Sequence, residues 1–520
     1  MGRGEAGDLV VDQTHGQGRG DDLDVAQGGR LALARHDPDR AVRDQLGPKD
    51  GQGRQIGLGV RGEEHDVGFR ERLADRHVVG SRGQVDPEVG IGDPHDRHPG
   101  AGLDPELVQP RGGVGAFHPG IVPRMASYAR SAGPLLVFGP RSTSYDFGPG
   151  HPLTPRRFGP AIDLLRAVGA EPGLAPEPAT DDELLSVHDE AYIAAVRRFG
   201  ADPGLPPAFG IAPFGDVPAF AGMHEAGAAV AGGSLRAIEA ILRGDAVHAF
   251  HPGGGLHHAM RARASGFCVY NDVALAVAAA RTAGLRVLYV DLDVHHGDGV
   301  EAIHADDPGV LTVSFHESGR YLFPGTGDAV GGRGPAAGTI VNVPFEPYTG
   351  EDAWLAAVRS LVPDLAAAFR PDIVVSQHGA DSHAWDPLAH LRVTTTAMGA
   401  AARLIDEVAH RHAGGRWLAT GGGGYDVYRV VPRAWALTWL AGAHRDPPPE
   451  TPPNWRERWA AEADEWGAGS LPEHFADEPN AGLTVGAGQR AAEAAAAETV
   501  RRVRGLVLPD PGPPGSTPAI

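Results

Sequence analysis

The sequence predicts an α/β fold with a mostly parallel central β-sheet that is covered by helices on both faces. From residue 245 onward, short apolar runs typical of buried strands alternate with longer stretches of helical periodicity. Polar and glycine-rich segments directly follow four of the predicted strands, and in such sheets ligands bind at the carboxyl ends of the strands. With 520 residues, of which 42% are hydrophobic and 22% charged, the chain can bury one large core.

Each element is assigned from the spacing of its apolar residues. In residues 183–199, for example, Leu184, Val187, Tyr192 and Val196 supply one apolar face of a helix. The apolar run 135–138 opens the domain, and residues 203–218 form a loop rich in Pro and Gly. The expected helices span 158–168, 183–199, 219–242, 271–283, 351–369, 396–412, 428–441 and 491–503. The expected strands span 245–250, 286–291, 310–315, 339–343, 372–377 and 416–420.

The chain divides into three regions of different composition. Residues 1–124 lack helical or strand periodicity and cannot bury enough apolar area, so they are predicted to be disordered or to precede a native start at Met125. Residues 125–445 are predicted to form the catalytic domain, and residues 446–520 form a proline-rich and helical C-terminal tail.

Composition also limits the classes of function. The formal net charge of -20 argues against non-specific attraction to nucleic acid or to an anionic membrane. The longest apolar stretch, residues 273–289, is interrupted by Arg281 and Arg286, and the N-terminus lacks the apolar core of a signal peptide. The single cysteine, Cys268, excludes an intramolecular disulfide. We therefore expect a cytoplasmic enzyme with no membrane partner and no direct nucleic-acid partner.

The stretch Val290-Asp-Leu-Asp-Val-His-His-Gly-Asp-Gly299 carries the strongest chemical signal. Alternate side chains of a strand share a face, so Asp291, Asp293 and His295 are expected to point the same way. Two carboxylates and one imidazole suit a divalent ion such as zinc, and the same set can hold ferrous iron. The alternative is a strand end whose acids cap the next helix and whose polar residues are satisfied within the fold.

Asp381, which follows the predicted strand 372–377, supplies a third ligand for the same metal. Together with Asp293 and His295 it leaves open positions for water and substrate, as catalytic sites do. A metal in such a site lowers the pKa of bound water and polarises a carbonyl group. The set therefore suits hydrolysis of an unreactive amide.

Residues for proton transfer follow two further strands. His257 and His258 come after three glycines, and Asp291 and Asp298 are spare carboxylates that could fix their tautomers. Tyr425 follows four glycines, and its phenol could donate a hydrogen bond to an oxyanion, a contribution of roughly 3 to 4 kcal/mol. The alternatives are a surface loop for the histidines and a phosphate cradle for the glycines, although the glycine run lacks the Lys-Ser/Thr of a P-loop.

Taken together, these motifs resemble those of the zinc-dependent histone deacetylase family. Their order and spacing match the family from about residue 135 to residue 443, and His378 and Trp385-Asp-Pro-Leu388 look most like its bacterial acetoin-utilisation branch. The resemblance implies an arginase/deacetylase-like three-layer fold with a mostly parallel sheet. The motifs are Pro252-Gly-Gly-Gly-Leu-His-His-Ala-Met260, Ala264-Ser-Gly-Phe-Cys-Val-Tyr-Asn-Asp272, Val290-Asp-Leu-Asp-Val-His-His-Gly-Asp-Gly299, Phe323-Pro-Gly-Thr-Gly327, Gly379-Ala-Asp381 and Gly421-Gly-Gly-Gly-Tyr425.

The resemblance implies metal-dependent hydrolysis of acetyl-lysine. Zinc would be held by Asp293, His295 and Asp381. His258 would act as general base and then as general acid, with His257 as a second, electrostatic histidine. The remaining catalytic residues would be Asp291 and Asp298 behind the histidine pair and Tyr425 against the acetyl carbonyl.

It also implies residues that bind the substrate. Phe267 and Phe323 would wall a narrow channel for an aliphatic side chain, and the Gly266 carbonyl would accept the scissile amide proton. Asp216 would be the rim acid that grips the substrate backbone, and Arg157 would lie beneath the acetate pocket. The family further binds a monovalent cation, usually potassium. Its ligands here would be Asp291, Asp293, His295, Ser314 and Phe315, largely through backbone oxygens.

Departures from the family pattern narrow the range of expected substrates. Family members that deacetylate polyamines have an acidic residue near the channel mouth, where this chain has Leu388. This departure favours acetyl-lysine in a protein over an acetylpolyamine as the substrate. An acetylated acyl-CoA synthetase is an example of such a protein. An arginase-like enzyme with two manganese ions would need another acid where this chain has Gly297. A non-catalytic acetyl-lysine binding module is a third alternative. The physiological substrate and the oligomeric state stay open.

Overall fold

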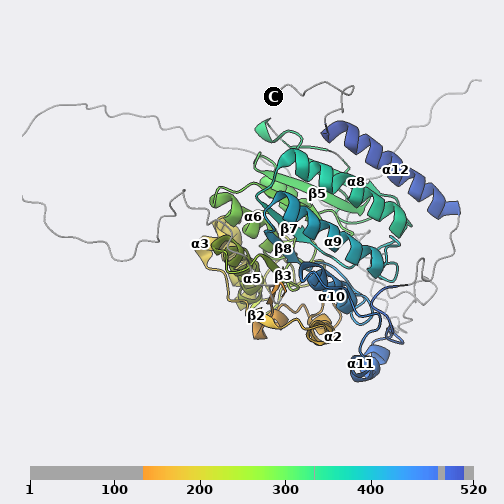
Figure 1. Cartoon of the computed structure of the whole chain (residues 1–520). Helices are drawn as coiled ribbons and strands as arrows, with labels where there is room; N and C mark the ends of the chain where they lie inside the picture. The colour runs from red at the N-terminus through yellow and green to blue at the C-terminus, as the bar shows by residue number, and fades with distance from the viewer. Residues whose placement is uncertain (1–132, 329, 333, 478–486, 509–520) are drawn as a thin grey trace, which may run out of the picture. The chain divides into compact units, whose positions relative to one another are not determined.

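The computed structural model of the chain describes residues 133–328, 330–332, 334–477 and 487–508. The predictions for residues 1–124, including a native start at Met125, concern residues outside these ranges. The described residues form one parallel β-sheet with helices on both faces (Figure 1), which confirms the predicted fold class.

The sheet has eight strands in the described part of the chain, in the order β2-β1-β3-β8-β7-β4-β5-β6. Every neighbouring pair is parallel. The carboxyl ends of β3, β8, β7 and β4 therefore lie side by side at one edge. The strands are β1 (Leu135–Val137), β2 (Pro172–Leu174), β3 (His248–His251), β4 (Val287–Asp291), β5 (Val310–Glu317), β6 (Ile340–Phe345), β7 (Ile373–Gln377) and β8 (Trp417–Thr420).

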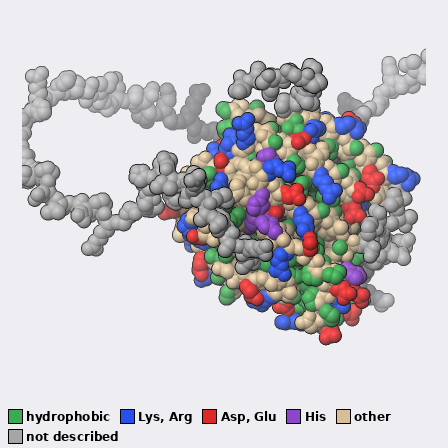
Figure 2. Space-filling model, viewed as in Figure 1, with side chains coloured by type: hydrophobic (Ala, Val, Ile, Leu, Met, Phe, Trp, Pro, Cys, Tyr) green, Lys and Arg blue, Asp and Glu red, His purple; other side chains and the backbone are tan. Residues whose placement is uncertain are grey.

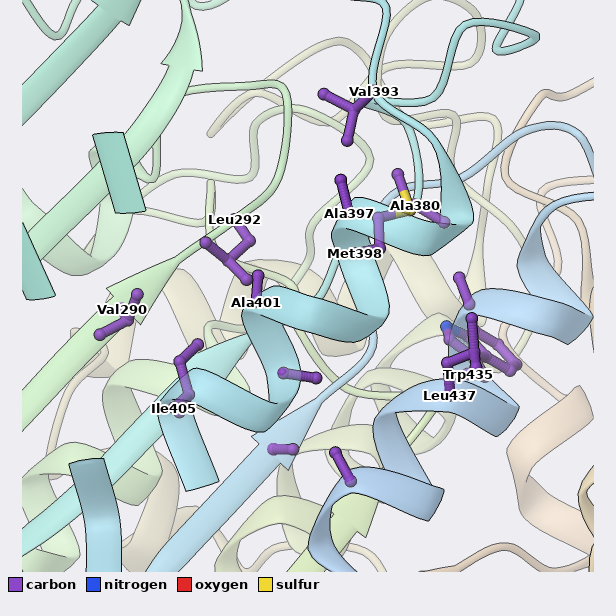
Figure 3. Close-up of a cluster of buried hydrophobic side chains, with 14 of the residues drawn as sticks. Val290, Leu292, Ala380, Val393, Ala397, Met398, Ala401, Ile405, Trp435 and Leu437 are labelled. Atoms are coloured by element: carbon purple, nitrogen blue, oxygen red, sulfur yellow. The ribbon is translucent and has the colours of Figure 1, made fainter. Parts of the chain in front are cut away.

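Two apolar cores cover the two faces of the sheet, because alternate residues of its strands point to opposite sides. On β4, Leu288 and Val290 belong to one core, and Val287 and Tyr289 belong to the other. The first core is closed by α2 (Phe158–Ala167), α8 (Glu351–Phe369), α9 (Thr395–His412) and α10 (Val431–Gly442), and the second by α4 (Glu190–Ala201), α5 (Met223–Arg243) and α6 (Asp272–Thr282). Figure 3 shows part of the first core, where Val290 lies near Ile405 of α9.

The helices agree with the predicted periodicity, with ends that differ by a few residues. β2, α7 and α11 were not predicted. β2 and α7 have three and seven residues, which are too few for a detectable period, and α11 buries only Trp455 and Ala463 and so has little apolar pattern. The helices are α2 (Phe158–Ala167), α3 (Asp181–Leu184), α4 (Glu190–Ala201), α5 (Met223–Arg243), α6 (Asp272–Thr282), α7 (Asp298–His304), α8 (Glu351–Phe369), α9 (Thr395–His412), α10 (Val431–Gly442), α11 (Pro453–Glu465) and α12 (Ala487–Val507).

The prediction of one continuous helix over residues 183–199 is wrong. The chain instead forms α3 and α4 with a break between them. At the break, the backbone N–H of Asp189 donates to the Arg261 carbonyl at 3.0 Å, and His188 Nδ1 lies 3.1 Å from the Met260 carbonyl. These contacts with the loop after β3 replace the hydrogen bonds that a continuous helix would make.

The described parts of the C-terminal tail pack on the helices that cover the sheet. The indole N–H of Trp455 in α11 donates to the Pro160 carbonyl of α2 at 2.8 Å, and Arg504 of α12 donates to the Ser360 carbonyl of α8 at 2.9 Å. Between these helices, Asp477 lies 2.6 Å from the guanidinium of Arg433, whose side chain is fully buried. The tail therefore contributes a counter-ion to the domain.

The surface mixes both signs of charge. On the face drawn in Figure 2, arginine and acidic side chains are interspersed, and histidine side chains gather near the middle of the face. Among the described residues, no helix combines the length and the apolar character needed to cross a bilayer.

Replacing the tail carboxylate by Asp477→Asn should lower the free energy of unfolding by about 3 to 5 kcal/mol, because it leaves the buried Arg433 without its counter-ion. Denaturant unfolding followed by circular dichroism measures this loss. As a control, Asp464→Asn on the exposed side of α11 should change stability by no more than about 0.5 kcal/mol. Equal stabilities of the two variants would contradict the stabilising role of the tail.

Candidate active site

The polar loops that follow β3, β8, β7 and β4 meet at the carboxyl edge of the sheet. They contain residues 252–258, 421–425, 378–381 and 292–298, respectively. The four strands are consecutive in the sheet order, so their loops are neighbours although they are distant in the sequence. This is the edge at which ligands bind in parallel sheets.

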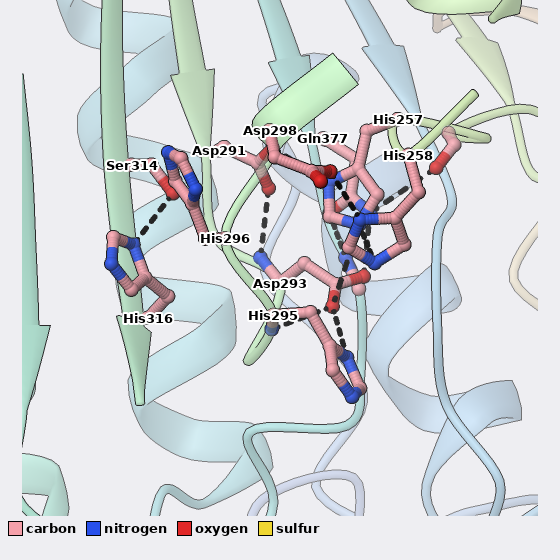
Figure 4. Close-up of polar contacts among 12 residues, drawn as sticks. His257, His258, Asp291, Asp293, His295, His296, Asp298, Ser314, His316 and Gln377 are labelled. Carbon is pink, nitrogen blue, oxygen red and sulfur yellow. Dashed lines mark hydrogen bonds and ion pairs between the residues drawn. The ribbon is translucent and has the colours of Figure 1, made fainter. Parts of the chain in front are cut away.

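Asp293, His295 and Asp381 form a buried group whose possible ligand atoms all lie within 4.8 Å of one another. His295 Nδ1 lies 3.0 Å from Asp293 Oδ1 (Figure 4). It also lies 3.1 Å from Asp381 Oδ2. Two buried carboxylates with one imidazole carry excess negative charge, which a divalent cation would neutralise. The oxygen and nitrogen donors suit zinc or ferrous iron.

The carboxylate oxygens of this group are oriented by the surrounding chain. Asp293 Oδ2 accepts hydrogen bonds from the Gln377 amide at 2.6 Å and from the Gly423 backbone N–H at 2.8 Å. Asp381 Oδ1 accepts from the Val294 backbone N–H at 2.9 Å. Such contacts fix metal-ligating carboxylates before an ion binds.

Two glycines give the carboxylates the space that they occupy. A Cβ atom at Gly379 would lie 2.2 Å from Asp293 Oδ2, and one at Gly423 would lie 2.0 Å from Asp381 Oδ2. Any side chain at either position would displace a ligand. The observed residues therefore fit a metal ion held by two carboxylates and one histidine.

Asp291 does not join this group, and the expectation that three residues converge by strand alternation is wrong. β4 ends at Asp291, so Asp293 and His295 lie beyond the strand and are placed by the following loop. Asp291 Oδ2 instead lies 2.8 Å from His257 Nδ1 (Figure 4). It also accepts a hydrogen bond from the Tyr289 hydroxyl at 2.6 Å. It supports the histidine pair, as the family resemblance implied.

His257 and His258 are buried neighbours with opposite pKa shifts. Burial and the charge of His257 lower the pKa of His258 to about 4, although Asp298 lies 2.7 Å from its Nδ1. Burial would also lower the pKa of His257, but Asp291 and Asp293 outweigh it and raise that pKa to about 9. At neutral pH, His258 is a neutral base beside a protonated His257, with 3.0 Å between their Nε2 atoms.

Tyr425 lies at the end of the glycine loop that follows β8. Burial, with the charges of Asp381 and Asp293, raises the pKa of its phenol well above the usual value, so the hydroxyl keeps its proton. The backbone N–H of Tyr425 donates to Asp386 Oδ2 at 2.9 Å. The buried Arg157 donates to the Gly422 carbonyl at 2.6 Å and anchors the same loop.

Two phenylalanines flank these groups. The ring of Phe323 lies 5.0 Å from that of His258, and the ring of Phe267 lies 6.0 Å from that of Tyr425, measured between centroids. Phe267 has a φ of 64°, and its carbonyl accepts a 2.8 Å hydrogen bond from the Tyr145 hydroxyl. The two rings thus bring apolar surface to both catalytic groups.

Two of the predicted substrate residues contact each other. Asp216 Oδ2 accepts from the Gly266 backbone N–H at 2.6 Å, and the Gly266 carbonyl accepts from the Cys268 thiol at 3.1 Å. Leu388 is half-buried, and among the described contacts it reaches the site only through Asp386, whose Oδ1 accepts its N–H at 2.9 Å. Asp386 therefore links the loop of Leu388 to that of Tyr425.

The predicted potassium ligands come from the end of β4, from the loop that follows it and from the adjacent strand β5. Asp291 of β4 pairs with Ser314 of β5, and Phe315 is fully buried next to it. Asp293 and His295 follow Asp291 in the chain. Potassium binding by these residues stays a prediction.

Three supporting residues were not identified from the sequence. Tyr289 lies two positions before Asp291 on β4, so strand alternation could have placed both on one face. Gln377 is the last residue of β7, and its position at a strand end was the only signal. Asp386 lies in the stretch Trp385-Asp-Pro-Leu388 that resembles the acetoin-utilisation branch, but its contact with Tyr425, 39 residues away, could not be inferred from the sequence.

Comparisons with known proteins show which proteins the chain resembles. Residues 151–441, more than half of the chain, match the histone deacetylase domain. The chain is 44% identical over 334 residues to the acetoin utilization protein AcuC of Bacillus subtilis (strain 168), covering 62% of this chain and 86% of that protein. It is 34% identical over 351 residues to AcuC of Staphylococcus xylosus, covering 66% of this chain and 90% of that protein.

Solved structures show the same fold. An HDAC homolog complexed with SAHA matches with a TM-score of 0.62 and 26% identity, covering 72% of this chain and 100% of that chain. An HDAC homolog from Aquifex aeolicus matches with a TM-score of 0.61 and 26% identity, covering 71% of this chain and 99% of that chain.

The hydrogen bond from Gln377 to Asp293 can be tested by Gln377→Leu. Loss of this donor should weaken zinc binding by about 10- to 100-fold, because residues that orient metal ligands contribute that much to affinity. Competition with a chromophoric chelator measures the change. Gln489→Leu on α12, whose amide contacts Glu493, is the matched control and should leave the zinc affinity unchanged. An unchanged affinity in Gln377→Leu would show that Gln377 does not support the metal.

Proposed function

Since this chain belongs to the histone deacetylase family and is an AcuC-like deacetylase, we propose that it removes acetyl groups from lysine side chains of proteins with one zinc ion. One observation carries the proposal: the buried Asp293, His295 and Asp381 group lies beside a neutral His258. A metal site with a general base beside it is one arrangement that hydrolyses an amide.

The protein's own residues supply the proton transfers and the charge stabilisation. Zinc, when bound to the three ligands, would polarise the acetyl carbonyl and lower the pKa of a water molecule. His258 takes the proton of the attacking water, and Asp298 holds its Nδ1 and fixes the tautomer. His258 then returns the proton to the departing lysine amine. The positive charge of His257 and the Tyr425 hydroxyl stabilise the oxyanion.

The two phenylalanine rings fit an aliphatic chain better than a polar one. Phe267 and Phe323 flank the catalytic groups and would pack on the methylene groups of an acetylated lysine while excluding water. Asp216 would bind the backbone of a protein substrate at the rim. The apolar Leu388, where an acid would attract a second ammonium group, supports a protein substrate, such as an acetylated acyl-CoA synthetase, over an acetylpolyamine.

Further proposals concern the second cation and the compartment. The backbone oxygens near Asp291 and Ser314 would hold potassium behind the metal site, where the buried carboxylates attract cations. The free and buried Cys268 is compatible with a reducing cytoplasm, in which we place the protein.

Tyr425→Phe should lower kcat for an acetyl-lysine peptide by about 100- to 1,000-fold with little change in KM, because it removes an oxyanion donor. Turnover of the peptide and of an acetylpolyamine should be measured side by side with zinc-loaded protein. Tyr428→Phe is the matched control, since that hydroxyl contacts Glu462 of α11, and it should leave kcat unchanged. Binding of the peptide with no turnover by the wild-type chain would favour an acetyl-lysine binding module instead.

The substrate preference can be tested by Leu388→Glu. An added carboxylate at the channel mouth should raise kcat/KM for an acetylpolyamine by about fivefold, equivalent to roughly 1 kcal/mol of attraction for an exposed ion pair. Leu388→Gln, which has nearly the same shape without the charge, is the control. A wild-type chain that turns over only the polyamine would overturn the preference for protein substrates.

A further inference from the structure

Three histidines and one aspartate meet at the amino-terminal edge of the sheet, away from the active site. His248 is the first residue of β3, and Asp406 and His410 lie one turn apart near the end of α9. His444 follows the end of α10. The catalytic loop leaves the other end of β3, roughly 10 Å farther along the strand. None of the four residues takes part in the proposed reaction.

The ring nitrogens of this cluster converge on one point. His410 Nε2 lies 3.2 Å from His248 Nε2 and 3.1 Å from His444 Nε2. Asp406 Oδ1 lies 3.4 Å from His248 Nε2, and Asp406 Oδ2 lies 3.2 Å from His444 Nε2. Ligands about 2.0 Å from a tetrahedral zinc ion are separated by about 3.3 Å. The observed separations match that value.

Hydrogen bonding alone explains this arrangement poorly. In a neutral imidazole only one ring nitrogen carries a proton, so Nε2 either donates one hydrogen bond or accepts one. His410 Nε2, however, has both other Nε2 atoms and Asp406 Oδ1, at 3.6 Å, around it. If all three Nε2 atoms were protonated and donated hydrogen bonds to the Asp406 carboxylate, their protons would lie close together and repel one another. A cation at the centre would instead satisfy all four lone pairs.

Two side chains of the cluster are buried, and the other two are exposed to solvent. The side chains of His248 and Asp406 are 3% and 10% exposed, whereas those of His410 and His444 are 45% and 53% exposed. Two ligands are thus fixed in the fold, and two lie where an ion can enter.

We propose that His248, Asp406, His410 and His444 bind a second divalent transition-metal ion of the zinc class. Calcium and magnesium prefer oxygen ligands only, so a site with three imidazoles and one carboxylate does not suit them. Four protein ligands complete a tetrahedral shell, so the site is structural, whereas the three-residue group of the active site leaves positions open. The ion would tie the start of β3 to α9 and to the end of α10.

Metal content of the full chain tests the proposal directly. Bound metal is removed from the protein with a chelator, and the protein is then equilibrated with zinc and desalted. Inductively coupled plasma mass spectrometry measures the zinc that stays bound. His410→Ala and His444→Ala should each bind about one zinc ion fewer per chain than the wild type. His412→Ala, at the same helix end but outside the cluster, should bind as much as the wild type. Circular dichroism checks that each variant is folded.

Cobalt(II) separates this site from the active site. The variant Asp381→Asn, which lacks one active-site ligand, should still show the visible absorption of tetrahedral cobalt(II) and a higher unfolding temperature when cobalt is present. Adding His444→Ala should abolish both signals, while His444→Ala alone should keep the deacetylase activity. Equal metal content in the wild type, His410→Ala and His444→Ala would overturn the proposal, whether or not the chain proves to be a deacetylase.

Discussion

Buried negative charge at the carboxyl ends of β4 and β7 is the constraint that organises the active site. Asp291, Asp293 and Asp381 are each at most 1% exposed, and an unpaired carboxylate in such a place would be strongly destabilising. Their oxygens contact the Tyr289 hydroxyl, the Gln377 amide, backbone N–H groups and two histidine rings, of which His295 contacts both Asp293 and Asp381. The charge that is left over favours a cation at the centre.

Parallel strand order explains why these partners are so far apart in the sequence. Neighbouring parallel strands need crossover connections, so the loops that meet at one edge come from distant parts of the chain. The contact between Arg157 and Gly422, for instance, joins residues 265 positions apart. Substitutions far from the metal in sequence can therefore change the position of a loop that supplies a catalytic group.

The sequence predicted the sheet well because alternation of apolar strands and helices is a property of whole segments. It also predicted the residues whose motifs lie within one loop, such as His257 and His258. It failed at the break between α3 and α4, where contacts with a distant loop override the helical period. It could not find the cluster of His248 and His444 either, because those ligands come from different elements and share no spacing.

The histidine pair shows how one loop can hold two different acid–base groups. His257 and His258 are adjacent in the sequence and equally buried, so burial alone would lower both pKa values. The difference arises because His257 faces Asp291 and Asp293, whereas His258 has only Asp298 behind it and the charged His257 in front. Once His257 holds a proton, its charge keeps His258 neutral. His257 therefore keeps His258 in the neutral form that the proposed general base needs. The proposed roles of the two histidines differ because their side chains point from the loop toward different carboxylates.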